Sequence, residues 1–313
     1  MSVAADMRIA CIGECMIELS QIDLNGGQAH VGFAGDTLNT AVYLSRLMPG
    51  SVSYLTNLGT DAFSGRMLTT FQAEGIDCTQ IGRHDSRLPG IYAIEVDAAG
   101  ERSFRYWREV SAARTLFAGV GANLNDLAGF DVIYLSGITL AILPPEVRTA
   151  LMARLGALRD AGHRIVFDSN YRPRLWTDAD TARATFAAMW SVSTLALPSF
   201  DDEAALFPGT TPAQVLDRIT GLGVLEIALK NGAKGPLIRA VGRDMQLSLP
   251  ASAHVVDTTG AGDSFNAGYL AARLLGQSPA KAATAGHSLA IQVIGHHGAI
   301  IPRNAMTEAS GYS

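Results

Sequence analysis

The sequence has little cysteine and no long uncharged apolar run, and both absences exclude whole classes of protein. The 313 residues include three cysteines, Cys11, Cys15 and Cys78, without a C-x-x-C spacing. This pattern supports neither a disulfide framework nor a zinc site, so we expect reduced thiols. No stretch reaches the ~18 apolar residues of a membrane span. The N-terminal residues, with Asp6 and Arg8, do not resemble a secretory signal. We therefore expect a cytoplasmic protein.

Basic charge is also scarce. The chain has 24 Lys and Arg residues against 29 Asp and Glu residues, which gives a formal net charge of −5 and a pI of about 5.8. Nothing in this balance favours nucleic acid or an anionic membrane as a partner. Hydrophobic residues make up 48% of the chain, as is typical of a packed α/β protein. The adjacent His296 and His297 would diverge on a strand, so they do not predict a metal site.

Short apolar runs alternate with helix-length segments along most of the chain. The runs end in Gly, Ser or Asn and cover residues 7–13, 130–137, 164–170, 193–199 and 225–232. Residues 36–47 have helical periodicity, with Leu38, Ala41 and Val42 at i, i+3 and i+4, and residues 145–162 have helix length. The alternation predicts an α/β fold with a mostly parallel central sheet flanked by helices. Ligands bind such folds beyond the carboxyl ends of the strands.

Residues 90–108 break this alternation. Two strand-like runs are joined by a turn at Ala99-Gly100, which predicts a β-hairpin. Residues 16–33 are also rich in strand-forming residues. We expect the two segments to form a small sheet that stands off the main domain.

A glycine-rich turn precedes an apolar helix at Val255–Leu270, VVDTTGAGDSFNAGYL. Unpaired N–H groups and the positive end of a helix dipole make such a turn a general anion site. A dinucleotide site needs a third glycine where Phe265 stands and an acid ~20 residues later. No Asp or Glu occurs between Asp263 and Glu308, and no G-K-[ST] follows the glycines. Dinucleotide and P-loop sites are therefore excluded.

Asp263 has two interpretations that the spacing leaves open. It is placed to cap the helix. Alternatively, Gly260 and Gly262 hold a transferring phosphoryl group while Asp263 faces the attacking hydroxyl. In that case the helix dipole predicts a lowered Asp263 pKa. Phosphoryl transfer tolerates a weak base, because its loose transition state needs orientation and late proton removal more than basicity.

Three motifs resemble the signatures of ribokinase-like (PfkB-type) carbohydrate kinases, in the family's order over about residues 8 to 303. They are AGDTLNTA, LKNGAKG and DTTGAGDSFNAGYL. The resemblance implies an ATP-dependent kinase of one domain, residues 1–313, in which about 16–33 and 90–108 form a β-sheet lid. It also implies that Mg²⁺ accompanies ATP. Family lids often pair through their edge strands, which implies a homo-oligomer. Ala34 replaces the first glycine of the sugar-side motif.

The resemblance also implies roles for residues at matching positions. The catalytic residues are the base Asp263 and an anion hole of Gly260, Ala261 and Gly262. The ATP-binding residues are Lys230, Gly232, Gly235, Asn170, Ser199, Glu203, Gly260 and Gly262. The sugar-side residues are Gly35, Asp36 and Asn39, whose polar groups suit hydroxyls. Some relatives bind a monovalent cation such as K⁺ where Asp257 and Thr259 stand.

The family's N-x-x-E element is altered in this chain. Its counterpart is expected at Phe200-Asp201-Asp202-Glu203, where Glu203 keeps the acid associated with Mg²⁺ and phosphate. The contacts that this Asn would make must be supplied by Ser199 or by water, or they are not made at all. Asp168 and Asn170 are expected to order the end of the preceding strand, and Asn170 also to reach an ATP phosphate.

Two arginines favour an acidic sugar as substrate. Tyr106 and Arg108 are two residues apart on a strand and so share a face. Arg172 follows the carboxyl end of the strand RIVFD. Arginine binds carboxylates through a bidentate fork, although pairing with surface acids would also explain either arginine.

Further segments of the chain resemble the 2-keto-3-deoxygluconate kinases of this family. They are GIY at 90–92, YWREVSAA, LSGI and DSNYRPRLW. This resemblance implies transfer of the ATP γ-phosphate to the C6 hydroxyl of 2-dehydro-3-deoxy-D-gluconate. The residues implied to hold this acid are Gly35, Tyr92, Tyr106, Arg108 and Arg172.

Two alternatives remain open. A fructokinase or ribokinase would act on a neutral sugar and would not need both arginines. A non-catalytic module would bind a sugar acid or a nucleotide without turnover. Asp263, the two turn glycines and Lys230 are all present, which speaks against the module.

Overall fold

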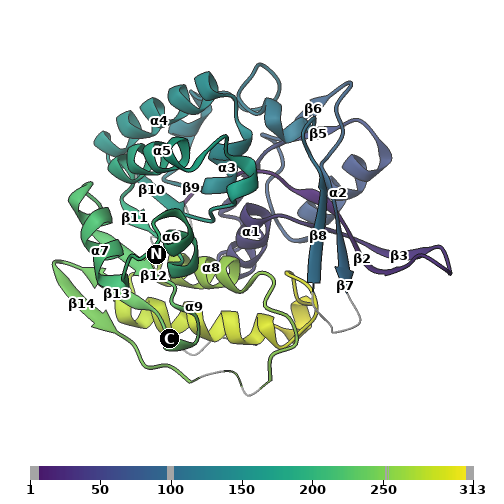
Figure 1. Cartoon of the computed structure of the whole chain (residues 1–313). Coiled ribbons are helices and arrows are strands. Elements are labelled where there is room, and N and C mark those ends of the chain that lie inside the picture. The colour runs from purple at the N-terminus through teal and green to yellow at the C-terminus, as the bar shows by residue number, and fades with distance from the viewer. Residues whose placement is uncertain (1–6, 97–101, 251, 253, 308–313) are drawn as a thin grey trace.

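The central sheet of the protein has eight strands. A computed structural model describes residues 7–96, 102–250, 252 and 254–307, and places the strands in the order β14-β13-β12-β11-β10-β9-β1-β4 (Figure 1). The strands are β1 (Ile9–Ile12), β4 (Val52–Leu55), β9 (Val132–Ser136), β10 (Arg164–Asp168), β11 (Leu195–Ala196), β12 (Glu226–Leu229), β13 (Leu237–Ala240) and β14 (Arg243–Gln246). All neighbours pair in parallel except at β13 and β14, which pair antiparallel. The predicted mostly parallel sheet is confirmed.

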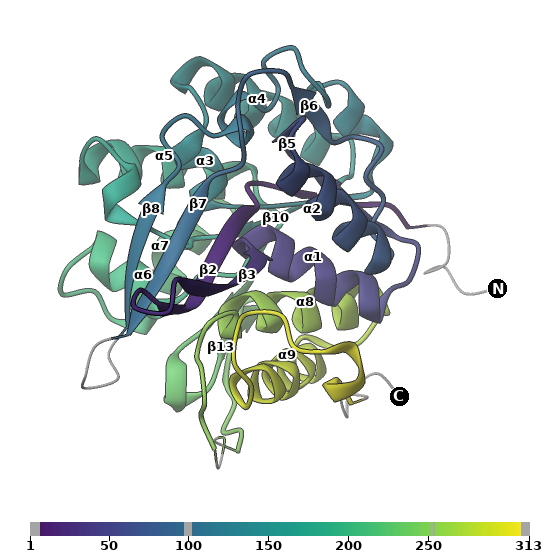
Figure 2. The same ribbon diagram turned by 90° about the vertical axis from the view of Figure 1, so that its right-hand side faces the viewer.

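Helices cover both faces of this sheet (Figures 1 and 2). They are α1 (Asp36–Leu47), α2 (Ala62–Ala73), α3 (Gly137–Ile142), α4 (Pro145–Asp160), α5 (Ala179–Val192), α6 (Phe200–Leu206), α7 (Pro212–Gly221), α8 (Ala261–Leu274) and α9 (Pro279–Ile294). Short 3₁₀ turns are η1 (Ala112–Thr115), η2 (Asp126–Gly129), η3 (Pro173–Leu175), η4 (Gly232–Lys234) and η5 (Arg303–Ala305).

Two apolar clusters, one on each face of the sheet, hold these layers together. Ile9 and Cys11 of β1 pack with α1, α2, α8 and α9, whereas Ala10 and Ile12 pack with α3, α4, α5 and α7. Successive residues of a strand point to opposite faces. Strands buried on both faces therefore appear in the sequence as continuous apolar runs.

Most predicted elements lie where the sequence placed them. The helix predicted at 36–47 coincides with α1, and α4 begins at Pro145, whose missing N–H is not needed in the first turn. The apolar run at 193–199 gives only the two-residue strand β11, because Pro198 follows and cannot donate to a strand ladder.

A separate four-stranded sheet, the lid sheet, stands to one side of the central sheet (Figures 1 and 2). Its strands, in the order β3-β2-β7-β8, are β2 (Met16–Asp23), β3 (Gln28–Ala34), β7 (Ile91–Val96) and β8 (Arg102–Trp107). β7 and β8 pair antiparallel, which confirms the predicted hairpin. Its turn at Ala99-Gly100 lies outside the described residues. A small parallel pair, β5 (Asn57–Gly59) and β6 (Gly82–His84), completes the strands.

The cysteines belong to the packing of the protein. Cys11 and Cys15 are buried and Cys78 is half-buried, and all three are free thiols. Burial raises the pKa of the Cys15 thiol well above its usual range, so the thiol is unreactive. In the part of the chain that the structure describes, no helix is long and apolar enough to cross a membrane, and no three His, Cys, Asp or Glu side chains are grouped to hold a metal.

Candidate active site

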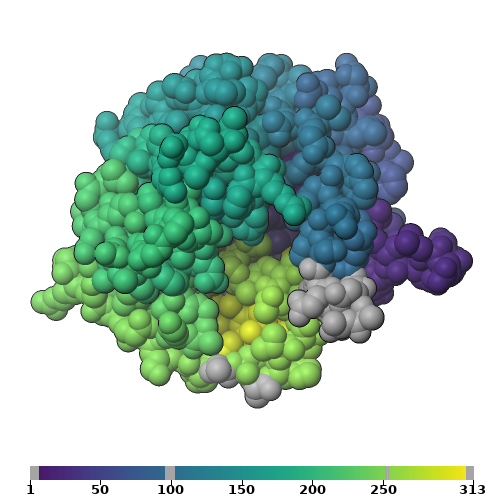
Figure 3. Space-filling view, viewed as in Figure 1, coloured from purple at the N-terminus to yellow at the C-terminus, as the bar shows by residue number. Residues whose placement is uncertain are grey.

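The glycine-rich turn leads directly into α8, below a hollow in the surface between the blue lid strands and the green and yellow C-terminal residues (Figure 3). Gly260 is the N-cap residue, with a φ of +76°, and a Cβ added to it would lie 2.7 Å from the carbonyl oxygen of Ala299. This left-handed and crowded position requires glycine. Asp263 lies inside the first turn of α8 and makes no cap hydrogen bond, so the interpretation of Asp263 as a helix cap is wrong.

Replacing Gly260 by alanine is expected to destabilise the protein by about 1–3 kcal/mol and to lower kcat, because the Cβ would push the turn away from Ala299. Urea unfolding and steady-state kinetics measure the two effects. Gly276→Ala is the matched control: Gly276 lies after the other end of α8 and also has a positive φ, of +84°, but its Cβ would meet open space. The control should lose about 1 kcal/mol at most and keep its kcat. Equal kinetics in the two variants would contradict a role for the turn in the reaction.

Asp263 is bound by a residue far away in the sequence. Its Oδ2 accepts a hydrogen bond of 2.7 Å from Nδ2 of Asn39. The pKa of Asp263 is raised to about 8, chiefly because burial removes the carboxylate from water, and the negative charges of Asp36 and Asp168 add to this. The bond from Asn39 and the charge of Lys230 oppose the shift. The predicted lowering of this pKa is wrong, because burial and like charge outweigh the helix dipole.

Lys230 lies beside the glycine turn. It directly follows β12, and its Nζ donates to Oδ1 of Asp168 and to Oδ1 of Asn266, both at 2.9 Å. Asn266 also donates to Oδ2 of Asp168 at 2.8 Å. A Cβ added to Gly262 would lie only 3.7 Å from the Lys230 Nζ. The ammonium group is therefore fixed next to the turn by two side chains.

The start of α1 meets the same region. A Cβ added to Gly35 would lie 2.1 Å from the carbonyl oxygen of Glu14, so the chain passes too closely here for any side chain. Asp36 accepts hydrogen bonds from the Ser136 hydroxyl and from Nδ2 of Asn170, the latter at 2.7 Å. Burial raises the Asp36 pKa. Asn170 has a φ of +29°, a sparsely populated conformation that functional sites often contain.

Two loops that precede α8 in the chain depend on specific backbone contacts. After Lys230, a Cβ added to Gly235 would lie 2.3 Å from the carbonyl oxygen of Leu247, and both Gly232 and Gly235 have positive φ. Before α8, Asp257 accepts from the N–H groups of Thr259 at 2.9 Å and Gly298 at 2.8 Å. The carboxylate of Asp257 thus joins the turn to the segment that follows α9.

The predicted acid-binding side chains of the lid sheet lie together. The ring centroids of Tyr92 and Tyr106 are 5.8 Å apart, and the Arg108 guanidinium lies 5.9 Å from the Tyr106 ring centroid. Arg108 is buried, and its Nε donates to Oε2 of Glu14 at 2.9 Å. The Tyr92 hydroxyl donates to Glu18. Arg108 therefore pairs with an acid, as the alternative interpretation expected, but with a buried one.

Arg172 lies in an exposed position. Its Nη1 is 3.3 Å from Oδ1 of Asp202, which matches the alternative of pairing with an acid. Asp202 also accepts from the hydroxyl of Ser169 at 3.3 Å. Burial raises the Asp202 pKa, with Arg172 and Lys230 lowering it and Asp168 raising it.

Glu203 pairs with a different arginine. It is 1% exposed and accepts from Nη2 of Arg218 at 2.7 Å, and burial raises its pKa to about 7. The Ser199 hydroxyl caps α6 by accepting from the N–H of Asp202. The carboxylate on the side of Asp168 and Lys230 is therefore Asp202, one residue before the position expected from the N-x-x-E pattern.

Several polar residues of the site were not singled out from the sequence. Asp168 was given only a role at the strand end, and Asn266, Ser136 and Glu14 were given none. Asn266 follows Asp263 by three residues and so lies on the same helix face. Ser136 and Asp168 are the last residues of β9 and β10, and polar residues at that edge of a parallel sheet were the available signal.

Comparisons with known proteins identify the family of the chain. The model of the pfkB family carbohydrate kinases matches residues 6–306. A 2-dehydro-3-deoxygluconokinase of Dickeya dadantii (strain 3937) is 47% identical over 307 residues, covering 95% of this chain and 98% of the relative. The protein of that name from Escherichia coli (strain K12) is 44% identical over 308 residues, covering 96% and 98%.

The fold is also found in solved structures. The crystal structure of a PfkB protein from Polaromonas sp. JS666 aligns with a TM-score of 0.82 at 24% identity, over 95% of this chain and 98% of that one. The family match extends over nearly the whole chain, and the two relatives are 47% and 44% identical over 95% and 96% of it. The chain belongs to the pfkB family of carbohydrate kinases.

Proposed function

We propose that the protein is an ATP-dependent kinase that phosphorylates the C6 hydroxyl of 2-dehydro-3-deoxy-D-gluconate, giving the 6-phosphate and ADP. The observation that carries this proposal is the identity of 47% and 44%, over nearly the full length, to relatives named 2-dehydro-3-deoxygluconokinase. The contact between Asp263 and Asn39 supports it, because it brings the proposed base to the proposed sugar side.

In the proposed mechanism, Asp263 takes the proton of the C6 hydroxyl as that oxygen attacks the γ-phosphorus and the bond to the ADP oxygen breaks. Asn39 donates a hydrogen bond to one carboxylate oxygen of Asp263. This bond fixes the orientation of the carboxylate for proton transfer. Gly260 and Gly262 offer backbone N–H groups at the start of α8, whereas the N–H of Ala261 donates to the carbonyl oxygen of Thr258 at 3.2 Å, and Lys230 adds a positive charge. Both stabilise the charge on the transferred group.

The nucleotide side suits ATP with Mg²⁺. Mg²⁺ is usually held by phosphates and one or two carboxylates, and Asp202 has a pKa that burial raises and the Asp168 charge raises further, so a cation would relieve this pair. Asp202 would hold the ion together with the phosphates, since both oxygens of Asp168 already accept from Lys230 and Asn266, and the bound ion would neutralise phosphate charge. The proposed ATP-binding residues remain Asn170, Ser199, Glu203, Lys230, Gly232 and Gly235. Asp257 and Thr259 remain proposed for a monovalent cation such as K⁺.

The substrate acid is proposed to lie between the lid sheet and α1, held by Tyr92, Tyr106, Arg108 and Arg172, with Gly35 beneath it. The test is ADP release with the keto-acid, fructose and ribose measured side by side. We expect a kcat/KM for the keto-acid at least about 100-fold above both neutral sugars. Equal turnover of fructose would reject the acid specificity. ATP binding without ADP release on any of the three would favour a non-catalytic module.

The pH dependence of kcat/KM follows from the raised pKa of Asp263. Because that pKa is about 8, the free enzyme keeps the proton on Asp263 below that pH and cannot use it as a base. We expect kcat/KM to rise about tenfold per pH unit up to about pH 8 and then to level off. A coupled assay with several buffers measures this profile. A flat profile across that range would contradict Asp263 as the base.

A further inference from the structure

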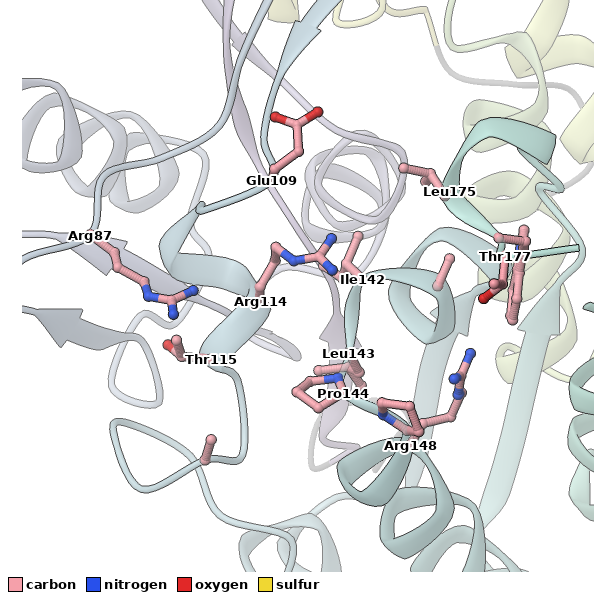
Figure 4. Close-up of a pocket in the computed structure, with 14 residues that line it drawn as sticks. Arg87, Glu109, Arg114, Thr115, Ile142, Leu143, Pro144, Arg148, Leu175 and Thr177 are labelled. Carbon is pink, nitrogen blue, oxygen red and sulfur yellow. The ribbon is translucent and has the colours of Figure 1, made fainter. Parts of the chain in front are cut away.

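A second cavity, of about 610 Å³, lies outside the candidate active site. None of the residues proposed above for catalysis, nucleotide or sugar line it. Its walls come from the segment before β7, from η1, from the start of α4 and from the end of η3 (Figure 4). The volume falls within the range of about 300–1,000 Å³ that small-molecule sites occupy.

Three arginines make the wall of this cavity basic. Arg87, Arg114 and Arg148 come from three different segments of the chain and line the cavity at separate places along its wall (Figure 4). All three are half-buried. Within the described residues, none of them pairs with a carboxylate. Glu109 also lines the cavity, but its carboxylate is exposed and accepts from the N–H of Arg108. The cavity therefore carries excess positive charge.

Trp176 provides an independent observation in the same wall. Trp176 is 8% exposed, and among the described residues its buried Nε1 donor has no hydrogen-bond partner. The Arg148 guanidinium lies 5.2 Å from the ring centroid, and burial lowers the Arg148 pKa. An orphan donor is costly unless it finds an acceptor. An anion in the cavity would supply acceptor atoms to the arginines.

We propose that this cavity binds a small phosphorylated organic acid. Each guanidinium offers a planar fork that matches phosphate or carboxylate oxygens. Three forks exceed what one carboxylate needs, which favours a ligand with a phosphate and a second acidic group. A phosphorylated sugar acid has this chemistry, and its size fits the cavity.

A ligand in this cavity would lie between the lid hairpin and the core. Arg87 lies in the connection that enters β7, and Arg114 lies in the connection that leaves β8. Arg148 belongs to α4, in the helical layer of the core. A ligand that contacts all three would join both connections of the lid hairpin to the core. Its binding should therefore slow backbone hydrogen exchange in residues 85–90 and 108–115.

The test is calorimetric titration of the full chain with 6-phosphogluconate. A saturating nonhydrolysable ATP analogue with Mg²⁺ keeps the probe out of the nucleotide side. We expect Arg148→Gln and Arg87→Gln each to weaken probe binding by at least about tenfold. Arg66→Gln, which removes an exposed arginine of α2, should bind like wild type. Gluconate and inorganic phosphate should bind more weakly than the probe, since each offers only one of the two acidic groups.

Arg108→Ala separates this cavity from the proposed substrate site. Binding that survives in Arg108→Ala but is lost in Arg148→Gln supports the proposal. Binding lost in Arg108→Ala and retained in the cavity variants assigns the probe to the substrate site and overturns it, as does the absence of binding at millimolar probe. Gluconate binding as tight as the probe would overturn the phosphate preference. Arg148→Lys, which keeps the charge and loses the fork, replaces Arg148→Gln if that variant does not fold.

Discussion

Asp263→Asn is expected to lower kcat by at least about 100-fold while the protein stays folded. Asparagine has nearly the same shape and can still accept the hydrogen bond from Asn39, but it cannot take the proton of the attacking hydroxyl. Steady-state ADP release and circular dichroism measure the two quantities. Asp178→Asn is the matched control, because Asp178 is a true N-cap whose side chain accepts from the N–H of Thr181. A fully active Asp263→Asn enzyme would remove Asp263 from the reaction.

The same substitution should make the protein more stable at neutral and basic pH. The folded-state pKa of Asp263, about 8, exceeds its ordinary value of 3.8, so the folded state binds the proton more tightly than the unfolded state. The wild type therefore loses this contribution to the free energy of unfolding as pH rises through about 4 to 8. Asparagine does not titrate. We expect its Tm to exceed that of the wild type by a few degrees at pH 8, and the gap to narrow toward pH 4.

Arg108→Ala is expected to change both binding and stability. If Arg108 holds the substrate carboxylate, KM for the keto-acid should rise by at least about tenfold, with KM for ATP near the wild-type value. The substitution also leaves Glu14 charged and buried at 1% exposure, with neither carboxylate oxygen paired. Breaking a buried pair in this way costs about 3–5 kcal/mol, which urea unfolding measures.

Two variants separate these effects. Arg172→Ala removes an exposed guanidinium, so it should raise KM for the acid and change the free energy of unfolding by less than about 0.5 kcal/mol. In Glu14→Gln/Arg108→Ala neither residue of this pair carries a charge, so stability should recover in part while KM stays high. A double variant with the wild-type KM would exclude Arg108 from the substrate site.

The fold was largely predictable because its signals are local. Periodicity located α1 and α4, and continuous apolar runs located β1, β9, β10 and β12. The β13–β14 hairpin was missed for a physical reason. Its two-residue turn is Val241-Gly242, with φ of +51° and +70°. Valine is rarely found at positive φ, so the turn lacks the Asn-Gly or Asp-Gly pattern that usually marks it.

The site was only partly predictable, because its pairings join distant segments. The motifs located Asp263, Asn39 and Lys230, but periodicity and spacing do not reveal that Arg108 pairs with Glu14. The Asp263 pKa depends on burial and on neighbouring carboxylates, which only the folded chain brings together. The sequence made only the helix dipole visible, and the dipole lowers the Asp263 pKa. Burial and the neighbouring carboxylates raise that pKa by more than the dipole lowers it.

The bond between Asn39 and Asp263 also bears on when the protein becomes active. The two residues are 224 positions apart, and α8 with α9 completes the apolar cluster under α1. A nascent chain therefore holds α1 and the lid strands long before the partner of Asn39 has been synthesised. Local helices such as α4 form early, whereas contacts of such long range form late. After denaturation, enzyme turnover should therefore recover later than helix content does. The recovery of turnover would then report when folding is complete.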